Sequence, residues 1–130
     1  MPILIDGWNF IRDPKSRLKD KEPLQAAGVL IGYLQTFQLT HNDPIILVFD
    51  SKREFLDMKY KNSPKLTVVP TRDADDYIKR YIDQIPTRQR RNIRVVSSDN
   101  SVYYYARSCS AMVIKCEEFW NKFIDFSQRV

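Results

Sequence analysis

The chain has 130 residues, of which 43% are hydrophobic and 28% are charged, with a formal net charge of +5. This length fits one domain over residues 1–130, and the apolar fraction excludes a chain too polar to build a core. No apolar run approaches the roughly 20 residues that a membrane-spanning helix needs. Because the chain begins with a strand-like segment and no basic leader, a cytoplasmic protein without a membrane segment is expected.

The first predicted element is a short apolar strand over residues 3–5, followed by a polar segment. Pro23 then opens a helix, because its missing N–H is not needed in a first helical turn. Apolar residues at three- and four-residue steps give this helix one buried face: Ala27, Leu30, Leu34 and Phe37. The segment 42–44 ends the helix. Five consecutive apolar residues over 45–49 predict a strand covered on both sides.

The second half of the chain continues the alternation of strands and helices. Its expected elements are a weak helix over 51–60, a strand over 66–69 stopped by Pro70, a helix over 74–85, an arginine-rich turn after Pro86, a strand over 93–96, a helix over 101–107, a strand over 112–114 and a last helix that buries Phe119, Trp120, Phe123 and Ile124. This alternation predicts an α/β fold with a mainly parallel sheet and helices on both faces.

Aspartates follow four of the predicted strands. Asp6 follows the first, Asp50 the second and Asp99 the fourth, while the third leads to three acids at the start of a helix: Asp73, Asp75 and Asp76. The carboxyl ends of parallel strands share one edge, where open α/β folds bind ligands. Each aspartate also suits a helix N-cap, so for any one of them both interpretations stay open.

Carboxylates gathered in one cleft raise each other's pKa unless a cation neutralises them. Oxygen ligands select Mg²⁺ or Mn²⁺ over zinc. His41 is expected in a solvated loop, and Cys109 and Cys116 lack the spacing of a zinc or redox pair and are expected to be buried free thiols. Metal-assisted hydrolysis of a phosphodiester is therefore the expected chemistry.

The segment Ile3-Leu4-Ile5-Asp6-Gly7-Trp8-Asn9 resembles the opening motif of the NYN family of PIN-like nucleases, a strand followed by Asp-Gly-Tyr-Asn. The likeness continues at Val48-Phe49-Asp50, Ala74-Asp75-Asp76 and Ser97-Ser98-Asp99, and through the tail from Ala111 to Phe119. The order and spacing are most similar to the YacP-type bacterial branch. Two departures are Trp8 in place of the commoner tyrosine and Ser108-Cys109-Ser110 at a turn where glycine is usual.

The resemblance implies a PIN-like three-layer α/β/α sandwich and a Mg²⁺- or Mn²⁺-dependent ribonuclease, expected here to be an endonuclease. It also implies RNA as the partner, and some members of the family act on messenger RNA at the ribosome. By matched motif, the acidic site and metal ligands are Asp6, Asp50, Asp75 and Asp99, with Asp76 as a supporting ligand. Asn9 and Ser98 are expected to hydrogen-bond carboxylates, metal-bound water or the scissile phosphate.

The net positive charge favours a polyanionic partner, because Lys and Arg contacts with phosphates release counterions. The basic residues gather in segments 12–21, 52–65 and 88–94, and each cluster equally suits a solvated face. Four of them follow strand ends and are predicted to rim the acidic cleft and contact RNA: Lys15, Arg17, Lys52 and Arg53.

Two other functions compete with that of a nuclease. A PIN-like domain that holds RNA or a ribosomal surface without cleaving it would need the basic rim but no metal. A phosphatase of the haloacid dehalogenase type also places acids at strand ends. It needs two aspartates separated by one residue after the first strand, and Trp8 occupies the second of those positions.

Overall fold

The computed structural model describes residues 1–50 and 65–128, with side chains described as far as Lys122. Within these residues a single parallel sheet is formed by β1 (Ile3–Asp6), β2 (Ile45–Asp50), β3 (Leu66–Thr71), β4 (Arg94–Val96) and β5 (Met112–Ile114). The strands lie in the order β3-β2-β1-β4-β5. The predicted α/β class with a parallel sheet is confirmed.

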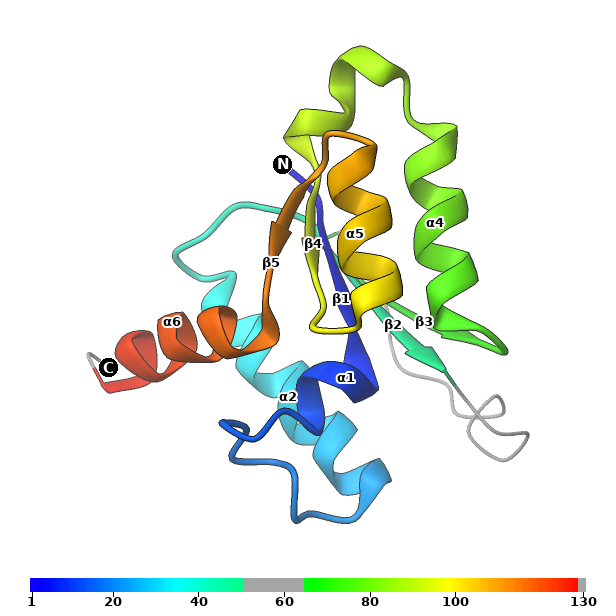
Figure 1. Ribbon diagram of the computed structural model, residues 1–130. Helices are drawn as coiled ribbons and strands as arrows, with labels where there is room; N and C mark the ends of the chain where they lie inside the picture. The colour runs from blue at the N-terminus through cyan, green and yellow to red at the C-terminus, as the bar shows by residue number, and fades with distance from the viewer. Residues whose placement is uncertain (51–64, 129–130) are drawn as a thin grey trace.

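Helices cover both faces of this sheet, as Figure 1 shows. The helical elements are α1 (Gly7–Ile11), α2 (Pro23–Phe37), α4 (Ala74–Gln84), the 3-10 helix η1 (Thr87–Asn92), α5 (Asn100–Ser108) and α6 (Cys116–Gln128). Alternate strand residues serve the two faces: Leu4 packs in the core under α4 and α5, while Ile3 and Ile5 pack in the core that α1, α2 and α6 cover. The layers are those of the expected three-layer sandwich.

Strand β1 is the centre of the sheet and carries the first site residue at its end. It lies between β2 and β4, and all four of its residues are buried. The chain adds β2 and β3 on one side of β1 and then returns to add β4 and β5 on the other. Ligand crevices of open parallel sheets lie where the strand order reverses in this way. The fold therefore places the carboxyl ends of β1 and β4 beside such a crevice.

Aromatic packing fixes α1, the short helix that leads out of β1. The ring of Phe10 stacks on Trp120 of α6 with centroids 4.2 Å apart, and Phe119 meets the same ring edge-on at 5.6 Å. The Trp120 indole N–H also donates to the Phe10 carbonyl over 2.6 Å. A buried indole that satisfies its N–H in this way contributes area and direction together. Helix α6 thus fixes the position of α1, the helix that carries Trp8 and Asn9.

Two expectations about the chain were wrong. Strand β3 does not stop at Pro70 but continues to Thr71, because β3 is an edge strand and its ladder with β2 can lose one N–H donor. Residues Gly7–Ile11 form a helix where only a polar segment was expected. The expected helix over 51–60 and the side chains of Phe123 and Ile124 lie outside the described residues.

The remaining sequence expectations concern single residues. Cys116 is buried and Cys109 is half-buried, and both are free thiols, so full burial was correct only for Cys116. His41 follows α2 in an exposed position, as expected. Across the described ranges, no helix is both long and apolar enough to cross a bilayer.

Candidate active site

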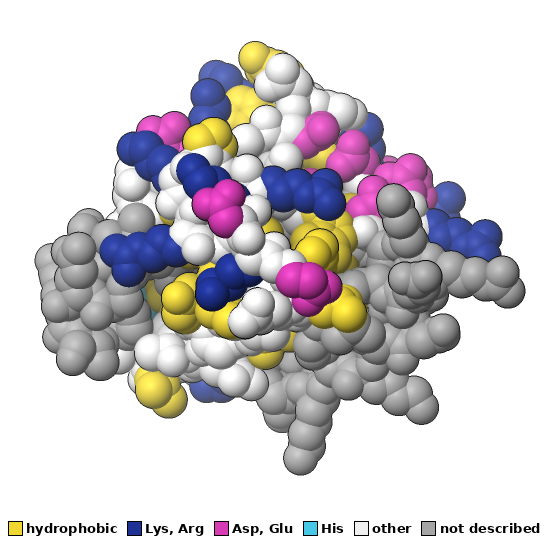
Figure 2. All heavy atoms as spheres, turned by 90° about the horizontal axis from the view of Figure 1, so that it is seen from below, with side chains coloured by type: hydrophobic (Ala, Val, Ile, Leu, Met, Phe, Trp, Pro, Cys, Tyr) yellow, Lys and Arg dark blue, Asp and Glu magenta, His cyan; other side chains and the backbone are white. Residues whose placement is uncertain are grey.

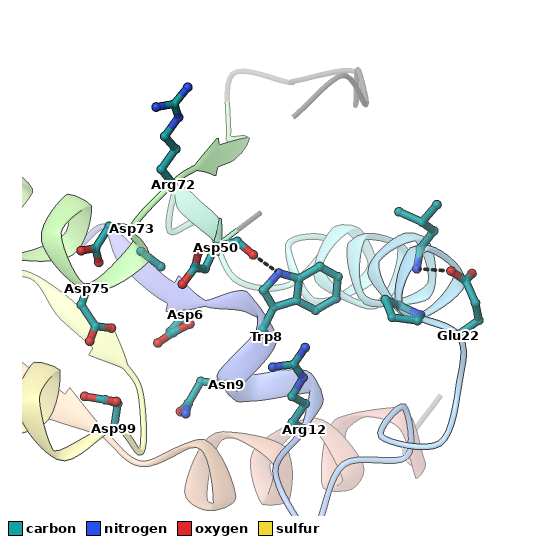
Figure 3. Close-up of a pocket in the computed structure, with 13 residues that line it drawn as sticks. Asp6, Trp8, Asn9, Arg12, Glu22, Asp50, Arg72, Asp73, Asp75 and Asp99 are labelled. Carbon is teal, nitrogen blue, oxygen red and sulfur yellow. Dashed lines mark hydrogen bonds between the residues drawn. The ribbon is translucent and has the colours of Figure 1, made fainter. Parts of the chain in front are cut away.

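A cavity of about 890 Å³ opens at the carboxyl ends of the central strands. Five aspartates line it, and Figure 3 shows their carboxylates around a common space: Asp6, Asp50, Asp73, Asp75 and Asp99. They come from the ends of β1 and β2, from the first turn of α4 with the residue before it, and from the start of α5. Residues distant in sequence therefore share one pocket, as the parallel topology requires.

Asp6 occupies the deepest of these positions, at the junction of β1 and α1, and only 6% of its surface is exposed. Glycine follows it for a steric reason. A Cβ added at Gly7 would lie 2.5 Å from the Phe49 ring and 2.9 Å from the Val48 carbonyl oxygen. Because glycine has no side chain, the chain can turn into α1 directly against β2 at this point. Asp6 therefore stays at the floor of the cavity.

Burial and neighbouring charge both disfavour ionisation of Asp6. Loss of hydration is the largest cause, and repulsion from Asp75, Asp99 and Asp50 adds to it, so the pKa of Asp6 rises to about 7. The backbone N–H of Asn9 opposes the rise, although it does not reach the carboxylate well enough to cap α1. A carboxyl held in this state gains from any cation that enters the cavity.

At the start of α4, one aspartate caps the helix and the other does not. Asp73 caps the helix, since its Oδ1 accepts the N–H of Asp76 over 3.0 Å. Asp75 lies in the first turn and lines the cavity; burial, then repulsion from Asp99 and Asp73, raises its pKa. Asp76 is not among the residues lining the cavity, and its carboxylate pairs with Arg80 at 2.9 Å.

Asp99 combines both interpretations in one side chain. Its Oδ1 accepts the N–H of Val102 over 3.2 Å, which caps α5, and the residue also lines the cavity. The Asp99 N–H donates to the Oγ of Ser97, a fully buried hydroxyl at the end of β4, over 3.1 Å. Ser97 was not singled out from the sequence, because the sequence does not show which of the two serines before Asp99 is buried.

Asn9 is held on the other side of Asp6 by a network that reaches α6. Its Oδ1 accepts the Ser98 N–H over 2.7 Å and lies 3.1 Å from the Cys116 sulfur, which donates its S–H. The Ser98 hydroxyl in turn accepts the Cys116 N–H over 3.0 Å. Asn9 lines the cavity, whereas Ser98 does not. Burial raises the pKa of Cys116 to about 12, which keeps its thiol protonated as a donor.

The basic residues that line the cavity differ from those expected. They are Arg12, which follows α1, and Arg72, which precedes Asp73. Lys15 instead pairs with Glu117 at 3.1 Å, and neither Lys15 nor Arg17 lines the cavity. Lys52 and Arg53 lie outside the described residues. Arg12 comes one turn after Trp8, so recognising α1 in the sequence would have placed it at this edge.

Figure 2 views the end of the molecule to which the strands point, and it shows basic side chains interspersed with acidic ones over this surface. Basic and acidic side chains therefore share this surface. Positive charge on the same surface weakens the repulsion that a polyanion would meet on approach.

The donor set fits a hard divalent cation. Oxygen atoms dominate it, and the raised pKa of Asp6 reflects negative charge that a cation would neutralise. As the side chains stand, no group of three acids, histidines or cysteines in the described ranges is close enough to hold a metal ion.

Residues 3–130 match the family model of the YacP-like NYN domain. The chain belongs to the YacP-like NYN domain family. The resemblance seen in the opening motif is thereby confirmed over almost the whole chain, and membership places this NYN domain among the PIN-like nucleases. That class supports a ribonuclease-type function for this chain.

Two solved structures share the fold of this NYN domain. Rae1 (YacP) from Bacillus subtilis matches with a TM-score of 0.76 and 22% identity, covering 99% of this chain and 76% of Rae1. A mutant of the same protein, with one tryptophan replaced by leucine, matches with a TM-score of 0.76 and 22% identity, covering 98% and 77%. No curated protein matches the sequence.

Proposed function

We propose that this NYN domain is a metal-dependent endoribonuclease. The observation that carries the proposal is the convergence of Asp6, Asp50, Asp75 and Asp99 in one cavity at the strand-order reversal. Asp6, Asp75 and Asp99 would hold a Mg²⁺ or Mn²⁺ ion, with Asp50 at the rim. Such an ion, when bound, activates water and offsets charge on a phosphodiester.

The residues of the chain itself would position the substrate. Asn9 has its side-chain oxygen engaged by Ser98 and Cys116, so its NH₂ group is the part available to donate to a phosphate oxygen. Arg12 and Arg72 supply positive charge on the cavity wall. They lower the cost of bringing an RNA backbone next to several carboxylates.

We further propose that the domain acts in the cytoplasm on messenger RNA, with the ribosome as a partner. Membership of the YacP-like branch supports this, together with the net charge of +5. Lys15 and Arg17 remain proposed RNA contacts on the surface outside the cavity. Lys52 and Arg53, which lie outside the described residues, remain proposed RNA contacts, and Asp76 and Ser98 remain proposed supporting residues.

Substitution of Asp6 tests the nuclease. Asp6→Asn should reduce Mn²⁺-dependent cleavage of an end-labelled single-stranded RNA by at least about 100-fold, because the buried carboxylate supplies charge that no neighbour can replace. Asp20→Asn is the matched control, since it removes the same charge from an exposed position away from the cavity. Cleavage should require Mn²⁺ or Mg²⁺ and stop in EDTA.

Equal cleavage rates for Asp6→Asn and the parent would refute the assignment. A parent chain that binds RNA but does not cleave it with any divalent ion would instead favour the competing function, a non-catalytic RNA- or ribosome-binding module.

A further inference from the structure

The cavity has a second end that the aspartates do not occupy. Its wall there is made of Trp8, Arg12, Glu22, Pro23 and Leu24, which come from α1, the residue after it and the start of α2. Figure 3 shows this end beside the acidic one, with Trp8 between Asp50 and Arg12. Its one carboxylate, Glu22, caps α2, and metal binding does not explain the aromatic, apolar and cationic side chains around it.

Arg12 is held in place by the indole of Trp8. Its guanidinium carbon lies 5.6 Å from the ring centroid, within range of a cation–π contact. The ring itself is fixed, since Trp8 packs against Phe49 at 4.8 Å and its N–H donates to the backbone carbonyl of Asp50. A planar guanidinium lying on a fixed ring keeps its N–H groups in one orientation, which suits recognition of a phosphate.

The opposite wall is apolar and exposed. Leu24 retains 44% of its surface although it is a large hydrophobic residue at the cavity. The first N–H groups of α2 are not available to bind a phosphate here. The Glu22 carboxylate already accepts those of Leu24 and Gln25 at 3.2 and 3.1 Å. Pro23 has no N–H at all. The α2 side therefore offers an apolar surface and Arg12 offers the positive charge.

We infer that this end of the cavity is a nucleotide subsite next to the scissile phosphate. It rests on the proposed function and specifies the substrate as single-stranded RNA longer than one nucleotide. Arg12 binds a backbone phosphate of the neighbouring nucleotide, and the base lies against Leu24, Pro23 and the half-buried Trp8. A base must leave its duplex partner to enter such a pocket.

Binding in EDTA tests the subsite without cleavage. The chain has two tryptophans, and Trp120 is only 1% exposed, so a change in tryptophan emission on adding a short single-stranded RNA reports Trp8. We expect the emission change in the parent and its loss in Trp8→Phe. The same RNA annealed into a duplex should produce a much smaller change.

Substitution of Arg12 gives the quantitative test. Arg12→Gln should weaken RNA binding about tenfold, since a charge-assisted contact to phosphate is lost. The slope of log affinity against log salt should also fall by about 0.7, the contribution of one phosphate contact in a single strand. Arg12→Lys keeps the charge and should restore the slope. Arg91→Gln is the matched control, an exposed arginine in η1 at the other end of the sheet.

In Mn²⁺, Arg12→Gln should raise KM with little change in kcat. Cleavage in which Arg12→Gln behaves like Arg91→Gln would overturn the subsite and leave the nuclease standing. Binding that depends on Arg12 and Trp8 in a chain without nuclease activity would support the subsite and overturn the proposed function alone.

Discussion

The Asp6 carboxyl is subject to burial and to like charge at once, and both act in the same direction. Asp75, Asp99 and Asp50 all raise its pKa, yet each lies on a different element. A structural aspartate is expected to gain cations or hydrogen-bond donors that keep its pKa low, whereas the Asn9 N–H offsets only part of the rise at Asp6. The electrostatic cost at this residue is the kind that functional sites retain.

The pH dependence of stability follows from this cost. The folded pKa of about 7 lies above the ordinary value of 3.8, so the folded state binds the Asp6 proton more tightly than the unfolded state. In EDTA, the free energy of unfolding should therefore decrease from about pH 4 to above pH 7, by roughly 4 kcal/mol from this group. Chemical denaturation at several pH values measures it.

The matched variants isolate the contribution of Asp6. Asp6→Asn should lose most of that decrease and be more stable than the parent at pH 8, while Asp20→Asn should follow the parent. Parallel stability curves for the parent and Asp6→Asn would show that Asp6 ionises in the folded state without a penalty.

At the scale of the element, the start of α4 shows what sequence reasoning can and cannot separate. Three aspartates fall within four residues, and the sequence predicts that they meet the sheet edge. Both Asp73 and Asp75 line the cavity, but the sequence does not reveal that the Asp73 carboxylate caps the helix, because that depends on where the helix begins, to within one residue. Helix α1 was missed for a similar reason, since five residues are too few to show a helical period.

The two positions can be told apart by paired substitutions. Asp73→Ala should cost about 1 kcal/mol of stability through the lost cap and leave the cleavage rate close to that of the parent. Asp75→Asn should abolish cleavage and leave stability unchanged or raised, since it removes a repelling charge. Thermal unfolding and RNA cleavage measured on both variants make the comparison, and the opposite pattern would reverse the two assignments.

The end of α5 offers a test of backbone strain. Ser110 has a φ of 68°, and the bonds from its N–H to the Arg107 carbonyl and from Ala111 N–H to the Ala106 carbonyl form a Schellman motif. Glycine normally occupies this position of the motif, which explains why glycine is usual at this turn in the family. Ser110→Gly should raise the unfolding free energy by about 0.5–1 kcal/mol, measured by denaturant titration. A loss of stability would mean that the Ser110 side chain contributes more than its strain costs.

At the scale of the whole molecule, the class of the fold follows from the sequence and the order of its strands does not. Apolar runs in alternation with amphipathic segments predict a parallel sheet, and four aspartates at strand ends then have to share an edge. The order β3-β2-β1-β4-β5 puts β1, which ends in Asp6, next to β4, which leads to Asp99, and it depends on contacts between distant segments. The position of Arg12 on the cavity wall depends on such contacts as well. The sequence therefore predicted other basic residues, Lys15 and Arg17, at the rim.

We propose that Asp6, Asp75 and Asp99, which come from three separate elements, hold one divalent ion. Anomalous diffraction from crystals soaked in Mn²⁺ tests it most directly, because the signal locates manganese independently of the atoms around it. The account predicts a peak in the cavity at bonding distance from carboxylate oxygens of Asp6, Asp75 and Asp99, and its absence in crystals of Asp6→Asn. Manganese bound only elsewhere, at a concentration that supports RNA cleavage, would contradict it.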